Sequence, residues 1–167
     1  PYFRLIIMLW NIDAQKVAEG YGISLDDFIE TVNGSGTSPI TEAAVATLLG
    51  GIRVKGQLPY DVIAKERINQ LIEVRNICKT SSVFFSPSTA TGKGRFYDEN
   101  DYQKKLNSVD SYVFCDLRAR FTEPPKFYEI PVDEVVSLTE QGVIKEGKMT
   151  VKQFFDRFPY EKYALKP

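Results

Sequence analysis

Apolar residues recur at helical spacing in the first part of this chain and alternate with polar residues, as in strands, further along. The helical segments expected first are 13–19, a segment capped by Ser24, and 41–49, which is ended by Gly50. Residues 32–39 are rich in glycine and serine and predict a loop between these helices. The chain therefore begins with a helical N-terminal segment.

The middle and C-terminal parts predict strands that are separated by turns and by three further helices. Strands are expected at 60–64, 68–76, 82–86, 111–117 and 126–132, and helices at 99–107, 133–141 and 151–157. The polar segment 65–67 is short, so the first two strands are expected to form a hairpin. This order predicts an α+β (mixed α/β) fold, with a mixed central sheet led by a β-hairpin and flanked by helices.

A chain of 167 residues is short enough to form a single domain, 1–167. Its expected parts are a helical segment at 1–38, a sheet-bearing core at 39–132 and C-terminal helices at 133–167. The longest apolar run near the start, 5–10, is too short to cross a bilayer and lacks the features of a signal peptide. We therefore expect a soluble, cytoplasmic protein with no membrane partner.

The chain has no histidine, which narrows the chemistry that it can perform. Ser-His-Asp catalysis, Cys-His catalysis and histidine-ligated zinc are excluded. Any metal would be held by oxygen atoms, which favours a hard cation such as Mg²⁺. The net charge of −1 provides no overall basic field, so contact with a polyanion would depend on local clusters of lysine and arginine.

Two carboxylates are expected to meet on the predicted hairpin. If the hairpin turns near Arg67, Asp61 lies opposite Glu73, and opposed residues have Cβ atoms about 4.5–5.5 Å apart on one face. Such carboxylates repel each other unless a cation lies between them. A divalent cation there would have the Val74 carbonyl as a third ligand, and Arg75 would hold the phosphate or the attacking water.

The same residues also fit a plainer interpretation. In an ordinary surface hairpin, Glu73 would pair with Arg75 or with Lys65. Such exposed ion pairs are common and contribute little to stability. The spacing of the hairpin residues alone leaves both interpretations open.

The hairpin residues resemble the active-site motif of the PD-(D/E)xK nuclease superfamily, which includes many restriction endonucleases. That motif has an aspartate at the start of one strand and an acidic residue, any residue and a lysine on the next. This chain has Asp61 and then Glu73 and Arg75, and the order of elements is similar over 41–117. The family often carries an acidic residue in the preceding helix, where this chain has Glu42. The resemblance implies a restriction-endonuclease-like fold and a Mg²⁺ or Mn²⁺ cofactor held by these carboxylates.

One departure from the motif concerns Arg75, which stands where the family has lysine. Arginine stays protonated and cannot act as a general base. In an active enzyme Arg75 would orient water or stabilise charge, and water or a substrate phosphate would accept the proton. The expected catalytic residues are therefore Asp61, Glu73 and Arg75.

A second cluster contains basic residues on and near a glycine-containing loop expected at 89–95. It is not a P-loop, because the leading glycine is absent and no serine or threonine follows Lys93. Lys93 and Arg95 would contact DNA phosphates, and Lys104 and Lys105 on the next helix would extend the same surface. A merely solvated loop and helix face is the alternative.

The function expected from these residues is that of a metal-dependent endonuclease acting on double-stranded DNA. A homodimer is expected, so that both strands are cut. Two alternatives stay open. One is a DNA-binding module on the same fold that does not cut, and the other is a small interaction protein with no nucleic-acid role.

Overall fold

The computed structural model is built around a five-stranded mixed sheet with the order β1-β2-β3-β7-β8. It describes residues 13–22, 24–32, 37–56, 58–78, 80–87, 89–91, 94–119 and 123–166. The strands of this sheet are β1 (Ile52–Arg53), β2 (Val62–Ala64), β3 (Gln70–Ile77), β7 (Ser111–Asp116) and β8 (Lys126–Pro131). β1, β2 and β3 are antiparallel in turn, β7 is parallel to β3, and β8 is antiparallel to β7. The expected α+β class, with a mixed central sheet and a β2–β3 hairpin, is confirmed.

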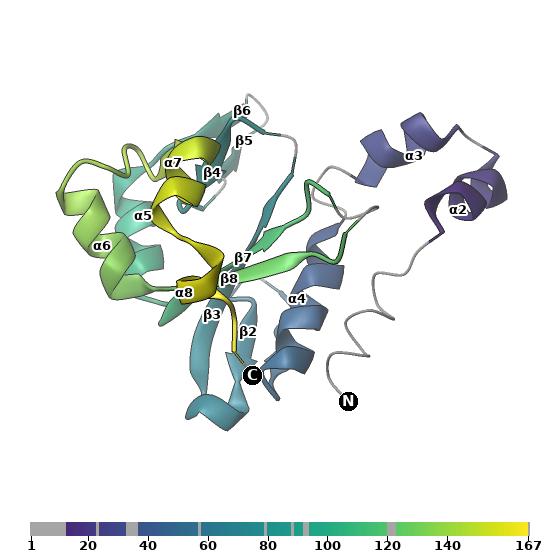
Figure 1. The fold of residues 1–167 in the computed structure, drawn as a ribbon. Coiled ribbons are helices and arrows are strands. Elements are labelled where there is room, and N and C mark those ends of the chain that lie inside the picture. The colour runs from purple at the N-terminus through teal and green to yellow at the C-terminus, as the bar shows by residue number, and fades with distance from the viewer. Residues whose placement is uncertain are drawn as a thin grey trace.

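Helices cover both faces of the sheet (Figure 1). One face carries α4 (Ser38–Leu48), and the other carries α5 (Glu99–Leu106), α6 (Val132–Glu140), α7 (Val151–Arg157) and the short α8 (Tyr160–Tyr163). Parallel strands need a crossover connection, and the chain between β3 and β7 includes α5. The helices α2 (Ala14–Tyr21) and α3 (Leu25–Val32) pack on each other and lie to one side of the sheet (Figure 1).

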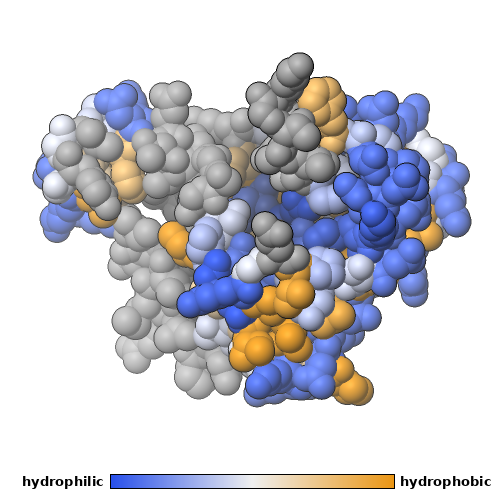
Figure 2. Space-filling view, turned by 180° about the vertical axis from the view of Figure 1, so that it is seen from behind, coloured by the Kyte–Doolittle hydropathy of each residue, from blue (hydrophilic) through white to orange (hydrophobic). Residues whose placement is uncertain are grey.

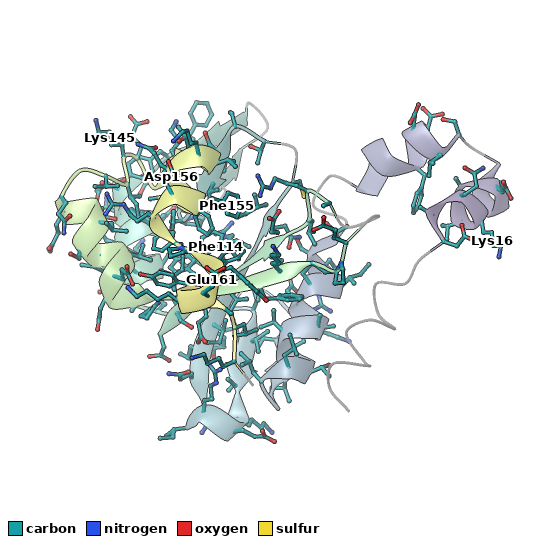
Figure 3. The ribbon with its side chains drawn as sticks, viewed as in Figure 1. Lys16, Phe114, Lys145, Phe155, Asp156 and Glu161 are labelled. Carbon is teal, nitrogen blue, oxygen red and sulfur yellow. The ribbon has the colours of Figure 1, made fainter. Side chains whose placement is uncertain are left out.

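The two faces of the sheet bury different side chains. The face under α4, called the aliphatic face below, packs mostly small and branched residues, among them Val45, Val62, Ala64, Ile72, Val74 and Val113. The opposite face, called the aromatic face, packs Phe85, Tyr102, Tyr112, Phe114, Phe154 and Phe158. In Figure 3 the ring of Phe114 lies in the interior, whereas Lys145 lies at the periphery and Lys16 lies far away on α2. Alternation along β7 produces this division, because neighbouring strand residues point to opposite faces.

The hairpin between β2 and β3 turns where the sequence predicts it. A single 3-10 turn, Lys65–Arg67, leads into Ile68 and Asn69, which have φ values of 57° and 59°. The second helix terminus predicted from Ser24 also forms, since the Ser24 hydroxyl accepts from the Asp27 backbone N–H at 3.1 Å. Thr150 caps α7 with a reciprocal bond to Gln153, as its position before 151–157 predicts.

Two expectations about loops were wrong. The described part of 89–95, expected to be a loop, forms strand β5 (Thr89–Thr91) and most of strand β6 (Gly94–Phe96), and the two strands pair antiparallel. The loop expected at 32–39 ends earlier, because Ser38 begins α4 and Pro39 lies in its first turn, where a missing N–H costs nothing.

A further pair, β4 (Ser82–Phe84) with β9 (Lys148–Thr150), joins segments far apart in sequence, and β9 was not expected. Residues 33–36 and Lys93 lie outside the described residues.

Seen from behind, the described residues present a mostly polar surface, with hydrophobic side chains gathered low in the view (Figure 2). The large hydrophobic side chains that are exposed in the described structure are Ile40, Ile52, Leu58, Ile68 and Phe96. Among the described helices, none has the length and apolar character needed to cross a membrane.

Candidate functional site

The β2–β3 register places Asp61 beside Glu73. Val62 pairs with Ile72 and Ala64 with Gln70, so the next step outward along the hairpin reaches Asp61 and Glu73. At this point the regular ladder stops. The Asp61 backbone N–H donates to the Ile72 carbonyl at 2.9 Å. The Asp61 carboxylate accepts from the Val74 N–H at 2.8 Å, and so ties the start of β2 to the middle of β3.

Glu73 is a buried carboxylate with a cation on each oxygen. The residue is only 5% exposed. Its Oε1 atom lies 2.8 Å from Nη2 of Arg75, and its Oε2 atom lies 2.6 Å from Nζ of Lys105. Arg75 comes from the same face of β3, two residues along, and Lys105 comes from the last turn of α5. The plainer interpretation is confirmed in that Glu73 pairs with Arg75, but Glu73 is buried and does not lie on an exposed surface.

Lys105 does not join the exposed basic surface expected for it. Its side chain is 11% exposed, and Nζ donates to the Pro59 carbonyl at 2.5 Å as well as to Glu73. Lys104 does face solvent, with 77% of its side chain exposed and a 3.3 Å pair to Asp101. Neighbouring helix residues point about 100° apart, so one lysine reaches the sheet while the other does not. No local sequence signal distinguishes the two, because α5 must first dock on the aromatic face.

The charges around Glu73 act in opposite directions. Burial raises the pKa of Glu73 above its usual range, and the neighbouring Asp61 carboxylate adds to this rise. The cations of Arg75 and Lys105 act to lower the same pKa. Burial also raises the pKa of Tyr112, whose hydroxyl senses the negative charge of Glu73. A carboxylate removed from water needs cations such as these to remain ionised.

Arg75 extends from this cluster toward a neighbouring hollow. Its Nη2 atom donates to the Ser86 carbonyl at 3.1 Å while also facing Glu73. Its Nε atom is buried and has no hydrogen-bond partner in the described structure. The hollow beyond it is lined by Arg75, Phe84, Ser86, Pro87, Phe96, Tyr97, Glu146 and Lys148.

Glu42 lies apart from the other carboxylates. Its Oε2 atom pairs with Nε of Arg53 at 2.6 Å. Arg53 is the cross-strand partner of Val62, whose side chain belongs to the aliphatic face, so the Glu42 pair lies on that face as well. The structure therefore does not bring Glu42 to Asp61 and Glu73.

The donors that the hairpin offers to a metal are two carboxylates and backbone carbonyls. Within the described ranges, no group of three or more His, Cys, Asp or Glu side chains is placed to hold a metal. The carboxylates of Asp61 and Glu73 are the donor type that a hard cation takes, because Mg²⁺ keeps several waters and often binds only one or two protein carboxylates. Both oxygens of Glu73 are occupied by cations, so a metal would have to displace one of them.

The other expected DNA contacts are only partly described. Arg95 pairs with Ala90 in the β5–β6 hairpin, but its side chain and all of Lys93 lie outside the described atoms. Val74, whose carbonyl was expected to bind a metal, uses its N–H to hold Asp61.

No protein-family model, curated protein or solved structure matches this chain. What the molecule does must therefore be inferred from its own residues and their geometry.

Proposed function

We propose that this chain is a metal-dependent endonuclease of restriction-enzyme type, which hydrolyses phosphodiester bonds in double-stranded DNA. The observation that carries the proposal is the cluster of Asp61, Arg75 and Lys105 around the buried Glu73 carboxylate, at one end of the β2–β3 hairpin. The order of elements around the cluster supports it as well. A helix precedes the hairpin, and a charged helix and then another strand, parallel to β3, follow it, in the order that the PD-(D/E)xK resemblance implies.

The cost of the cluster supports a functional role. Buried ion pairs lose much hydration energy, and apolar residues of similar volume are often as stable or more stable in their place. Here two cations flank one buried carboxylate beside a hydrophobic cluster of aromatic and aliphatic residues. Such an arrangement is easier to understand if the cluster handles a charged ligand than if it only stabilises the fold.

Each residue would have a defined task. Asp61 and Glu73 would hold Mg²⁺ or Mn²⁺, which when bound lowers the pKa of its water and stabilises developing phosphorane charge. Arg75 would hold the scissile phosphate, since its guanidinium stays charged. Lys105, released from one oxygen of Glu73, would bring a lysine ammonium to the phosphate. Lys105 thus brings from α5 the lysine that the resemblance expects at position 75.

A supercoiled-plasmid nicking assay tests the proposal. The unaltered protein should nick plasmid in Mg²⁺ or Mn²⁺ and not in EDTA, while Asp61→Ala should be inactive. Lys105→Met should lose nicking, and the matched variant Lys104→Met on the same helix should keep it. Nicking that survives Asp61→Ala would show a contaminant or a site elsewhere, and would end the proposal.

A second candidate is a DNA-binding module that does not cut. It is favoured by one observation, which is that both oxygens of Glu73 already have cations bound. This candidate predicts salt-dependent DNA binding with no nicking in any divalent metal. The absence of both binding and nicking would leave the remaining alternative, an interaction protein with no nucleic-acid role. A homodimer is proposed only with the endonuclease, because each copy would cut one strand.

A further inference from the structure

A hollow lies on the side of Arg75 that faces away from Glu73. It measures about 430 Å³ with its open mouth included. One wall comes from the β4–β9 pair, in which Phe84 lies opposite Lys148. The other comes from the end of β6, where Phe96 is 58% exposed and is followed by Tyr97. The hollow therefore lies between two short strand pairs that do not belong to the main sheet.

The floor of this hollow is fixed by close backbone contacts. The N–H groups of Phe85 and Ser86 both donate to the Gly147 carbonyl, at 2.7 and 3.1 Å. Gly147 has φ 63°, and a Cβ atom there would lie 2.4 Å from Cβ of Ser86. Only glycine fits so close a contact in this conformation. These contacts hold the β4–β9 side of the hollow in place.

The lining suits a flat group that is apolar on its faces and polar at its edges. Phe84, Phe96 and Tyr97 contribute aromatic rings. The charges nearly cancel, because Nζ of Lys148 lies 3.7 Å from Oε2 of Glu146 and Arg75 is shared with Glu73. A free anion gains little from such a balance. A nucleobase fits better, since aromatic side chains stack on its faces and polar groups bind its edges.

Arg75 places this hollow next to the carboxylate cluster. A single guanidinium group faces Glu73 and the Ser86 carbonyl with Nη2 and also lines the hollow. A phosphate held by Arg75 at the cluster would therefore carry its own nucleoside toward the hollow.

We propose that the hollow takes one unstacked nucleobase of the DNA strand whose phosphate reaches Asp61 and Glu73. This proposal rests on the proposed function for its substrate, and it adds that the strand is read at one opened position. The Glu146 carboxylate accepts from an exocyclic amino group, which cytosine has and thymine lacks. Single-stranded, frayed or mismatched DNA should therefore bind better than a perfect duplex, because less pairing has to be broken.

The test measures binding without metal and without cleavage. Fluorescence anisotropy would compare labelled (dC)₆, (dT)₆ and an abasic hexamer of the same charge in EDTA. We expect (dC)₆ to bind at least about tenfold more tightly than the abasic hexamer, in line with the stacking of one base. (dT)₆ should lie between them, and Glu146→Gln should reduce the difference between (dC)₆ and (dT)₆.

Phe96→Ala should bring the affinity for (dC)₆ close to that for the abasic hexamer. The matched control is Ile68→Ala, which removes another exposed apolar side chain outside the hollow and should change nothing. Equal binding of base-containing and abasic hexamers, or no effect of Phe96→Ala, would overturn the proposal. Base-dependent binding by a protein that never nicks plasmid would retain the hollow and reject the nuclease. Nicking without base-dependent binding would retain the nuclease and reject the hollow as a site for a base.

Discussion

Two acid–arginine pairs, one on each face of the central sheet, differ in their surroundings. On the aliphatic face, Glu42 and Arg53 pair at 2.6 Å with side chains 13% and 29% exposed, and join α4 to β1. On the aromatic face, Glu73 is 6% exposed in its side chain and has both Arg75 and Lys105. The first pair balances one charge with one charge. The second has two cations on one carboxylate and a further carboxylate, Asp61, beside them. Its charges can therefore be rearranged around a ligand.

The largest expected effect separates the two carboxylates by activity. Glu73→Gln should reduce plasmid nicking on the order of 10²–10³-fold, as loss of a preorganised charged group at a reaction centre does. Glu42→Gln should keep nicking within about threefold, because Glu42 lies on the other face with Arg53. Initial rates in Mg²⁺ provide the measurement. An equal loss of nicking rate in the two variants would support the prediction from sequence that Glu42 belongs to the metal site.

Exchanging the arginines should sharpen the same contrast. Arg75→Ala should abolish nicking but keep most DNA binding, because one phosphate contact is a small share of the total. Arg75→Lys should retain measurable activity, since a fixed position and a positive charge are preserved. Arg53→Ala is the matched change on the aliphatic face and should leave activity intact. Nicking rates and DNA-binding titrations followed by anisotropy would be measured for the three variants. Loss of nicking in Arg53→Ala would contradict the expected difference between the two pairs.

Stability should also differ between the pairs. Glu73→Ala leaves the partly buried cations of Arg75 and Lys105 without their buried carboxylate, which should cost about 3–5 kcal/mol of unfolding free energy. Glu42→Ala should cost about 1 kcal/mol, because Arg53 is nearer to solvent. Urea unfolding followed by circular dichroism measures both. A larger loss for Glu42→Ala would show that the aliphatic-face pair is the more structural of the two.

The smallest effect concerns the rings of the aromatic face at alkaline pH. Burial raises the pKa of Tyr128 to about 12. Its unfolded value is about 10, so its contribution is present below that pH and is lost as the pH rises toward the folded value. Tyr128→Phe should therefore move alkaline unfolding upward by a few tenths of a pH unit. Absorbance at 295 nm follows tyrosine ionisation, and circular dichroism follows unfolding. Ionisation of Tyr128 at a lower pH than unfolding would contradict this prediction.

The hairpin part of the site could be predicted from sequence, because its determinants are local. Strand alternation and a short polar turn are enough to place Asp61 opposite Glu73. Lys105 could not be placed this way, since its contact with Glu73 spans 32 residues and depends on how α5 docks. The β4–β9 pair could not be predicted for the same reason, because its two strands are far apart in the sequence. Glu42 was expected at the metal because the resembled family often has an acidic residue in the preceding helix, but the face of the sheet that Glu42 reaches is decided by packing.

The crossover between β3 and β7 has a consequence for how the molecule is made. The β2–β3 hairpin contains its own turn, so its two strands pair over a short stretch of chain. Lys105 comes from α5, which lies in the crossover between β3 and β7. Long-range parallel pairing is slow to form. The four-residue cluster is therefore completed late in synthesis and folding, and a nascent chain that ends before residue 116 carries the carboxylates without the finished site.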